Sequence, residues 1–368
     1  MGNSIGVAFR VTSFGESHGR CIGVVVDGCP SGLALSEEHI QRELDRRRPG
    51  QSRITSSRSE DDQVEVLSGV FNGRTTGAPI CMLVWNTDRD SSGYERRRWT
   101  PRPGHADWTA HVRYGGFNDY RGGGRFSGRI TAGFVMAGAL AKRLLHETLG
   151  VEVVAHTKEI GGVVADEVSP EEIMAKVEEI PVRCADPEAA VRMVKRIEEA
   201  SSQGDSLGGS IECHALNIPA GVGQPVFGTL EGDLARALYA VPAVKAVEFG
   251  LGGRFAKLRG SESNDPFRVE AGRVVTETNR AGGILGGIST GMLITCTVTL
   301  KPTPSIGRQQ RTIDIRNMEE ATIEIGGRHD PCIVPRAVPV IEAMVAAVLA
   351  DHLLQLGLIP PILGRDEK

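Results

Sequence analysis

The sequence contains few aromatic residues, 5% of its 368 positions, and no CxxC pair of cysteines. Its seven cysteines are scattered and odd in number, which argues against a disulfide framework or a zinc ribbon. No continuous apolar run is long enough to cross a membrane, and the N-terminal segment lacks the apolar core of a secretory signal peptide. We therefore expect a cytoplasmic protein with free thiols, no bound metal and no membrane contact.

Nucleotide-binding motifs and a net positive charge are also missing. The sequence has no Walker A motif, and no G-x-G-x-x-G follows a predicted strand, so nothing supports a Rossmann dinucleotide site. The formal net charge is −4, which leaves no global positive field to attract nucleic acid. We expect no nucleic-acid partner.

Glycine, at 46 positions, and locally clustered arginine are what the sequence has in abundance. Arg46, Arg47, Arg48, Arg53 and Arg58 lie within 13 residues. A guanidinium group can form two parallel hydrogen bonds with a carboxylate or a phosphate, whereas lysine offers a point charge. A solvated surface is the alternative for any single arginine. Where a cluster adjoins a turn, we favour an anion-binding site.

The hydrophobic pattern predicts an α+β fold in a single domain that covers residues 1–368, since no linker-like change of composition divides the chain. Residues 86–129 are rich in Gly, Arg, Asp and Pro and show no periodicity, and a connection of this length is uncommon unless it is functional. Strands are expected at 21–28, 79–85, 209–216 and 291–300, and helices at 36–45, at 131–150, from 186 onward and at 336–356.

Two histidines stand beside glycines in segments without helical or strand periodicity. Ser17 and His18 precede a predicted strand, and an imidazole at a strand edge can act as a general acid near neutral pH. A lone histidine is more often structural, which is the alternative here. The second, His105, precedes Asp107 by two positions, and that carboxylate could orient the ring or raise its pKa.

The triple glycine at 122–124 is followed closely by Arg125 and Arg129. Glycine allows backbone amides to approach an anion closely, so this segment would suit a phosphate. The alternative is a flexible loop like the RGG segments of RNA-binding tails. Such tails repeat, whereas this segment occurs once and runs into an apolar helix, which favours the phosphate site. Farther along the chain, Asp330 lies at the mouth of the last long helix, where we expect site residues.

Taken together, these segments resemble the chorismate synthase family over essentially the whole chain. The N-terminal and C-terminal signatures of that family are similar to residues 15–30 and 328–344. The motifs between them occur in family order: DRRRPGQSR (45–53), RPGHAD (102–107), YRGGGR (120–125), GDSLGG (204–209), AGGILGGIS (281–289) and KPTPS (301–305).

The resemblance implies a β-α-β sandwich with antiparallel sheets around long buried helices. It implies a carbon–oxygen lyase that converts 5-enolpyruvylshikimate 3-phosphate to chorismate by 1,4-anti elimination of phosphate, a step of aromatic amino acid biosynthesis. The family requires reduced FMN although the reaction has no net redox change, and NADPH serves only indirectly, as a source of reducing equivalents. A homotetramer is implied as well. The chain has no obvious inserted reductase segment, so we expect an external flavin reductase.

Roles for individual residues also come from the resemblance. His18 would protonate the departing phosphate, and His105 would stabilise or protonate the reduced flavin. Ser17 and Asp330 would form a relay beside flavin N5. Arg47 and Arg53 match positions that the family assigns to anionic ligands, either substrate or a nicotinamide nucleotide. The third predicted anion-binding residue, Arg129, comes from the glycine turn itself and not from the resemblance. FMN contacts would fall on Arg125, Phe126, Ser127, Pro242, Ala243, Gly286, Lys301, Pro302, Thr303, Pro304, Ser305 and Arg328.

Three positions depart from the family pattern. Phe126 and Ile130 make the turn after the glycines more apolar than in many members, and Ala246 stands where glycine is usual. Two other functions remain open at this point. A flavin-dependent oxidoreductase would share the flavin contacts but would need a nicotinamide site, for which the sequence shows no fingerprint. An RNA-binding module would use the arginine runs, and the net charge weighs against it.

Overall fold

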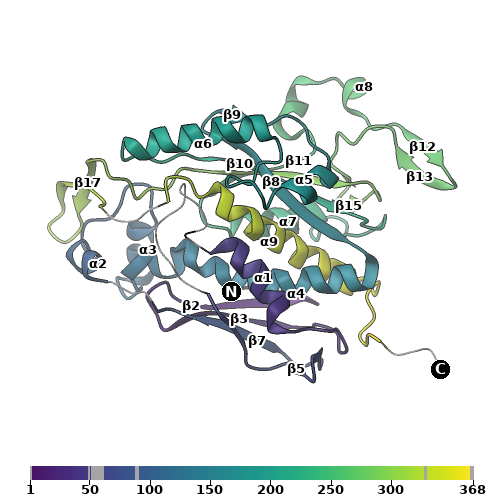
Figure 1. Ribbon diagram of the computed structural model, residues 1–368, viewed down its shortest axis with the longest axis horizontal. Coiled ribbons are helices and arrows are strands. Elements are labelled where there is room, and N and C mark those ends of the chain that lie inside the picture. The colour runs from purple at the N-terminus through teal and green to yellow at the C-terminus, as the bar shows by residue number, and fades with distance from the viewer. Residues whose placement is uncertain (1, 49, 51–61, 88–90, 327–329, 365–368) are drawn as a thin grey trace.

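The computed structural model describes residues 2–48, 50, 62–87, 91–326 and 330–364. Two antiparallel five-stranded sheets enclose a layer of helices (Figure 1). The first sheet has the order β1-β2-β3-β7-β4, formed by Ser4–Ile5, Arg10–Gly15, Cys21–Asp27, Ile80–Trp85 and Val64–Val66. The second has the order β11-β16-β10-β8-β9, formed by Val244–Phe249, Ile294–Leu300, Gly209–Leu216, Glu152–Ile160 and Val163–Val164.

The helices of the central layer are α4 (Thr131–Leu149), α9 (Val334–Gln355), α1 (Glu37–Arg47) and α7 (Leu230–Tyr239). The two longest, α4 and α9, pack closely because Gly138 of α4 lies against α9: a Cβ at that position would come within 2.3 Å of the Cα atom of Ala343. Helix α9 is long and apolar enough to cross a membrane, but 94% of its most apolar window is buried inside the protein. It is the central helix of the core.

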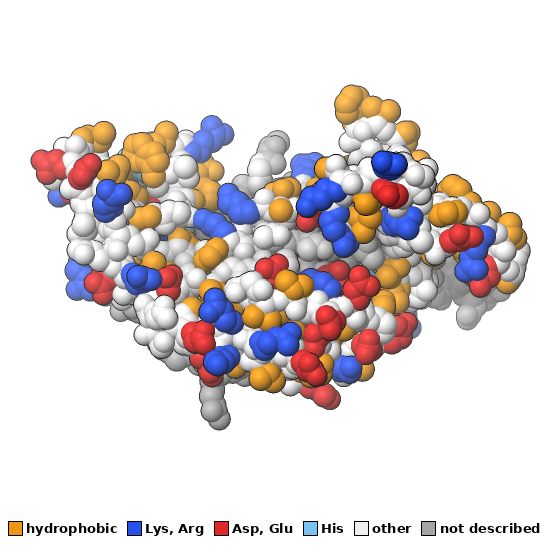
Figure 2. Space-filling model, turned by 90° about the horizontal axis from the view of Figure 1, so that it is seen from above, with side chains coloured by type: hydrophobic (Ala, Val, Ile, Leu, Met, Phe, Trp, Pro, Cys, Tyr) orange, Lys and Arg blue, Asp and Glu red, His pale blue; other side chains and the backbone are white. Residues whose placement is uncertain are grey.

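Shorter elements surround this sandwich. Outside the second sheet lie α5 and α6 (Figure 1). A hairpin of β12 and β13 projects from one end, and Figure 2 shows hydrophobic side chains on that end. The bounds of the remaining elements are β5 (Val70–Phe71), β6 (Arg74–Thr75), α2 (Ser92–Arg96), α3 (Asp107–Tyr114), η1 (Arg121–Phe126), η2 (Gly128–Ile130), α5 (Pro170–Lys176), α6 (Pro187–Ser202), η3 (Gly252–Lys257), α8 (Gly260–Ser263), β12 (Phe267–Glu270), β13 (Arg273–Thr276), β14 (Ile284–Leu285), β15 (Ile288–Ser289), β17 (Gln310–Asp314) and β18 (Glu319–Ile323).

Local signals in the sequence account for several helix ends. Ser36 is the N-cap of α1 and forms a capping box with His39, as expected from its position. Asp186 accepts hydrogen bonds from the backbone N–H groups of Glu188 and Ala189, so the predicted helix start is confirmed. Helix α4 ends at Gly150 as predicted.

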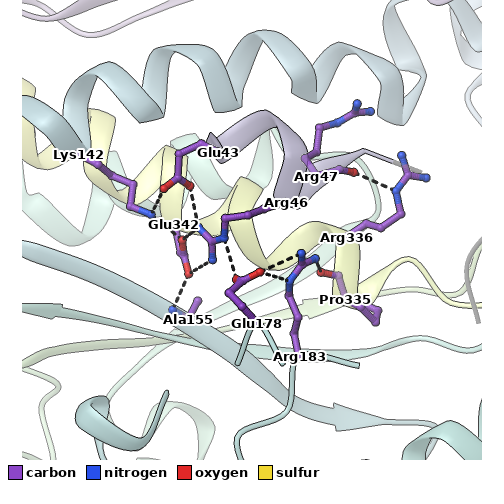
Figure 3. A network of polar contacts seen from close by, with 10 residues as sticks. All are labelled: Glu43, Arg46, Arg47, Lys142, Ala155, Glu178, Arg183, Pro335, Arg336 and Glu342. Atoms are coloured by element: carbon purple, nitrogen blue, oxygen red, sulfur yellow. Dashed lines mark hydrogen bonds and ion pairs between the residues drawn. The ribbon is translucent and has the colours of Figure 1, made fainter. Parts of the chain in front are cut away.

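A buried ion network ties the central helices to the second sheet (Figure 3). Glu342 of α9, 2% exposed, accepts hydrogen bonds from Arg46 of α1, Lys142 of α4 and the backbone N–H of Ala155 in β8. Burial alone would raise the pKa of Glu342, but the charges of Arg46 and Lys142 lower it to about 2. The carboxylate is therefore ionised, and α1, α4 and α9 meet at one charged group.

Several elements differ from the sequence prediction. Helix α1 continues two residues past the predicted end, through Arg47, and β16 begins at Ile294, after the start predicted at 291. The predicted irregular connection over 86–129 contains the eight-residue helix α3, which lacks a strong apolar stripe because it buries only Ala110. Its short length and exposed surface explain why periodicity did not reveal it.

Candidate active site

A cavity of about 630 Å³ lies at the N-terminal ends of α4 and α9. Ile130 and Thr131 line it at the start of α4, and Ile333 and Arg336 line it at the start of α9. The positive ends of two long helix dipoles therefore face the cavity, which favours an anionic ligand. Its described lining also includes seven Lys or Arg side chains and one carboxylate, Asp330.

The glycine turn separates the two predicted catalytic histidines. Gly122 and Gly123 both have positive φ, at 60° and 85°. A Cβ at Gly122 would lie 2.1 Å from Cδ2 of His18 and 2.7 Å from Oγ of Ser17, and a Cβ at Gly123 would lie 3.0 Å from Cε1 of His105. Only glycine fits between these side chains, so the sequence of the turn brings the histidines to one wall of the cavity.

His105 is held by a charged pair behind it. Its Nδ1 atom lies 2.6 Å from Oδ1 of Asp107, and the guanidinium group of Arg102 donates to both oxygens of the same carboxylate at 2.8 Å. Burial alone would raise the pKa of Asp107, but hydrogen bonds from Arg102 and His105 lower it far below its ordinary value. Asp107 is therefore ionised and orients His105, as the spacing suggested. The sequence analysis did not single out Arg102.

The two predicted anion-binding arginines that the structure describes share one buried carboxylate. Asp62 forms an ion pair with Arg47, 2.8 Å away, and another with Arg129. Arg47 is itself buried and also donates to Oγ1 of Thr131 and to the carbonyl of Gly128. Both arginines line the cavity, but their guanidinium groups are oriented by these partners. Asp62 carried no recognisable motif, so sequence reasoning missed it.

Cations that lack a carboxylate partner among the described residues lie on other walls. Arg125 donates to the carbonyls of Gly15 and Ser13, and burial lowers its pKa. Lys301 donates to the carbonyl of Gly104, and its pKa is lowered by burial and by the charge of Lys245. Their described hydrogen-bond partners are neutral oxygens, and the charge of Glu16 also acts on Arg125. A ligand phosphate would therefore meet positive charge that no ion pair among the described residues neutralises.

Asp330 lies at the start of α9 and forms an ion pair with Arg336, whose Nε atom donates to the backbone carbonyl of Arg47 at 3.2 Å (Figure 3). Arg336 thus connects the end of α1 with the predicted relay carboxylate. The side chain of Arg47 points away from the buried ion network in the same view. Among the described residues, no group of three or more His, Cys, Asp or Glu could hold a metal ion.

Comparison with known proteins identifies the family. The family model for chorismate synthase matches residues 9–354. Chorismate synthases of Dehalococcoides mccartyi strain BAV1 and Methanosarcina mazei are 54% and 56% identical to this chain. The first alignment covers 99% of this chain and all of the relative, and the second covers 98% of each. A crystal structure of chorismate synthase matches with a TM-score of 0.76 at 31% identity, over 96% of this chain and 93% of that one.

The chain belongs to the chorismate synthase family. This confirms the predicted family, the α+β sandwich and the assignment as a carbon–oxygen lyase. The division into a single domain and the roles of individual residues stay predictions.

The predicted site residues of this family member fall into three groups. Arg53 and Arg328 lie outside the described residues. Gly286, in the turn between β14 and β15, and Pro302 are not among the residues that line the cavity. The others line it: Ser17, His18, Arg47, His105, Arg125, Phe126, Ser127, Arg129, Pro242, Ala243, Lys301, Thr303, Pro304, Ser305 and Asp330.

The structure shows what surrounds the three positions that depart from the family pattern. Phe126 is partly exposed in the cavity wall with its ring 6.5 Å from that of Tyr114, whereas Ile130 is buried in the core. Ala246 follows a register shift in the pairing of β11 with β16, so the backbone is irregular where the family usually has glycine. In the arginine run 96–98, Arg97 is half-buried, with its guanidinium carbon 5.7 Å from the ring centre of Tyr94.

Proposed function

We propose that this protein forms chorismate from 5-enolpyruvylshikimate 3-phosphate by 1,4-anti elimination of phosphate and depends on reduced FMN. The observation that carries the proposal is the placement of Ser17, His18, His105 and Asp330 around one cation-lined cavity. The substrate is a phosphoester with two carboxylates, so it matches the excess of positive charge. In this proposal the external flavin reductase draws on NADPH, and the protein acts as a cytoplasmic homotetramer.

The residues around the cavity fit a flavin mononucleotide. Thr303 has a buried hydroxyl oxygen with no hydrogen-bond partner among the described residues, which suits a ligand atom. Arg125 and Lys301 supply positive charge for a phosphate, and Pro242 and Ala243 supply an apolar wall for a ring system. When bound, reduced flavin supplies the electron density that assists loss of phosphate from the substrate and ends the cycle reduced.

The two histidines have separate tasks in this proposal. His18 donates a proton to the leaving phosphate, which departs as an anion and is stabilised by any proton or positive charge nearby. His105, oriented by the ionised Asp107, stabilises the reduced flavin. Asp330 and Ser17 relay the proton that the substrate loses. Arg336 holds Asp330, and the Asp62 ion pairs keep Arg47 and Arg129 at the cavity wall.

Anaerobic incubation with the phosphoester and photoreduced FMN tests the proposal, with chorismate and phosphate measured separately. We expect the two products in equal amounts and in large excess over the reductant supplied. Oxidised FMN should support no turnover. Consumption of one equivalent of reductant per product would instead indicate a flavin-dependent oxidoreductase and would overturn the proposal.

A further inference from the structure

We propose that Ser91 is a positioning residue that fixes the orientation and the tautomer of His18; the inference rests on the function proposed above. His18 is 5% exposed, and its two ring nitrogens face different surroundings. The Nδ1 atom lies 2.9 Å from Oγ of Ser91, just before α2. The opposite edge, with Nε2, lies against the glycine turn: a Cβ at Gly122 would be 2.6 Å from Nε2. Nε2 is therefore the nitrogen on the side of the glycine turn.

A hydroxyl group suits a histidine that gives up a proton and takes it back. When His18 is protonated on both nitrogens, Nδ1–H donates to the Ser91 hydroxyl oxygen. When Nε2 has given up its proton, the neutral ring keeps its proton on Nδ1, and the same oxygen still accepts from Nδ1–H. The hydrogen bond survives both states, so the ring keeps its orientation while Nε2 exchanges its proton. A carboxylate in this place would stabilise the imidazolium and make the proton harder to transfer.

The surroundings of His18 support a fixed ring. The Tyr94 ring of α2 meets it edge to face, with centroids 5.1 Å apart and an interplanar angle of 73°. Asp119 approaches from the segment before η1 and is paired with Arg121 at 2.8 Å. Burial alone would raise the pKa of Asp119, but the Arg121 contacts, with a smaller contribution from the charge of His18, lower it. Asp119 is thus engaged by Arg121, and Ser91 is a neutral partner of Nδ1.

The test compares Ser91→Ala, Ser91→Cys and Ser91→Thr with the wild-type enzyme. General acid catalysis commonly contributes about 10²- to 10⁴-fold, so partial misorientation should lower kcat by about tenfold or more in the alanine variant. We expect KM to change little and the acidic and basic limbs of the kcat–pH profile to move. Threonine keeps the hydroxyl and should restore the profile, whereas cysteine, a weak hydrogen-bonding group, should not. Ser201→Ala, at an exposed position of α6, is the control and should behave as wild type.

A second measurement determines the tautomer of the His18 ring directly. In protein labelled with ¹⁵N-histidine, with the His18 signals assigned by their loss in His18→Gln, neutral His18 should carry its proton on Nδ1 in wild type and in Ser91→Thr. Mixed tautomers are expected in Ser91→Ala and Ser91→Cys. Unchanged tautomer and pH profile in both of these variants would overturn the inference. A wild-type enzyme that forms no chorismate would overturn the proposed function instead, and the tautomer measurement would still decide the role of Ser91.

Discussion

Arg47 illustrates, at the scale of single residues, what a planar cation does in a buried place. Its guanidinium group reaches Asp62, Thr131 and the carbonyl of Gly128 at once. A lysine in its place could pair with Asp62 but could not direct donors along three lines. The arginine-rich motif pointed to this residue, but its partner carboxylate lies 15 positions later in the chain and had no signal of its own.

We therefore expect Arg47→Lys to lower kcat/KM by about ten- to a hundredfold, because charged hydrogen bonds are lost in the site. The measurement is steady-state kinetics under anaerobic conditions. Arg96→Lys, at an exposed position of α2, is the control and should change stability by less than about 0.5 kcal/mol with activity unchanged. Arg97 would be a poorer control, because its guanidinium group contacts the ring of Tyr94. Equal effects of both substitutions would contradict a role for Arg47 in the site.

Substitutions of His18 and His105 should differ in their effects on flavin binding. His18→Gln should lower kcat by about 10²-fold or more and leave FMN affinity near that of wild type. His105→Gln should also weaken flavin binding or alter the flavin spectrum in the ternary complex, because that ring lies with Asp107 and Arg102 on the far side of the glycine turn. Flavin titration beside kinetics checks both. Full activity in either variant would show that the histidine is structural.

Gly122 gives a sharper test of the turn itself. An alanine there would need φ near 60° and would place its Cβ 2.1 Å from His18. The backbone strain alone costs roughly 1–2 kcal/mol. We expect Gly122→Ala to abolish most activity with a smaller loss of thermal stability. Gly260→Ala, where a Cβ meets nothing within 4 Å, should match wild type in both measurements.

At the scale of secondary-structure elements, the carboxylate of Glu342 in α9 holds α1 and α4 against α9 through its contacts with Arg46 and Lys142. Replacing it with alanine would leave Arg46 and Lys142 without their shared buried partner, and loss of one member of a buried pair typically costs about 3–5 kcal/mol. Urea unfolding of Glu342→Ala measures this, with Glu198→Ala on the exposed face of α6 as the control. A difference of less than about 1 kcal/mol between the two variants would contradict the central role of the network.

The lowered pKa of Glu342 predicts that the folded state loses stability at low pH. The folded-state pKa of Glu342 is about 2, below its ordinary value of 4.5. A carboxyl group with a lowered folded-state pKa stabilises the fold above its unfolded pKa and loses that contribution as pH falls. We expect the contribution of Glu342 to be complete above about pH 4.5 and to disappear toward pH 2. Thermal unfolding between pH 6 and pH 3 should show a smaller slope in Glu342→Gln than in wild type.

The helices and core strands could be predicted because their signals are local. Asp186-Pro187 and Gly150 mark helix ends by backbone hydrogen bonding, and the apolar run of α9 is continuous. The site partners could not be predicted in the same way. Asp62, Arg102 and Ser91 act through contacts that only the fold creates. Asp62 and Ser91 lie in no motif, and the RPGHAD motif that begins with Arg102 did not indicate the task of its side chain. The glycines at 122–124 were the exception, because three glycines in a row by themselves indicate a tight turn that other residues adopt only with strain.

At the scale of the whole molecule, the hairpin β12–β13 bears on the predicted homotetramer. Phe267, Val269 and Val274 are 65%, 75% and 66% exposed, and they lie on a hairpin that projects from the body of the protein (Figures 1 and 2). Clustered exposed apolar residues on a projecting element are typical of an interface between proteins. We therefore expect this hairpin to be covered by another copy of the chain in the tetramer.

Sedimentation equilibrium of wild type and of the double variant Val269→Asp, Val274→Asp tests this expectation. A charge buried without a partner in an interface is strongly unfavourable, so the double variant should shift toward smaller species at micromolar concentration. Arg268→Asp, on the same hairpin but already paired with Glu270 at its exposed surface, controls for the change of charge and should assemble as wild type does. Circular dichroism should show the same secondary structure in all three proteins, because the hairpin lies outside both five-stranded sheets. A double variant that remains tetrameric would place the interface elsewhere, and a wild type that is monomeric would remove the reason for expecting one.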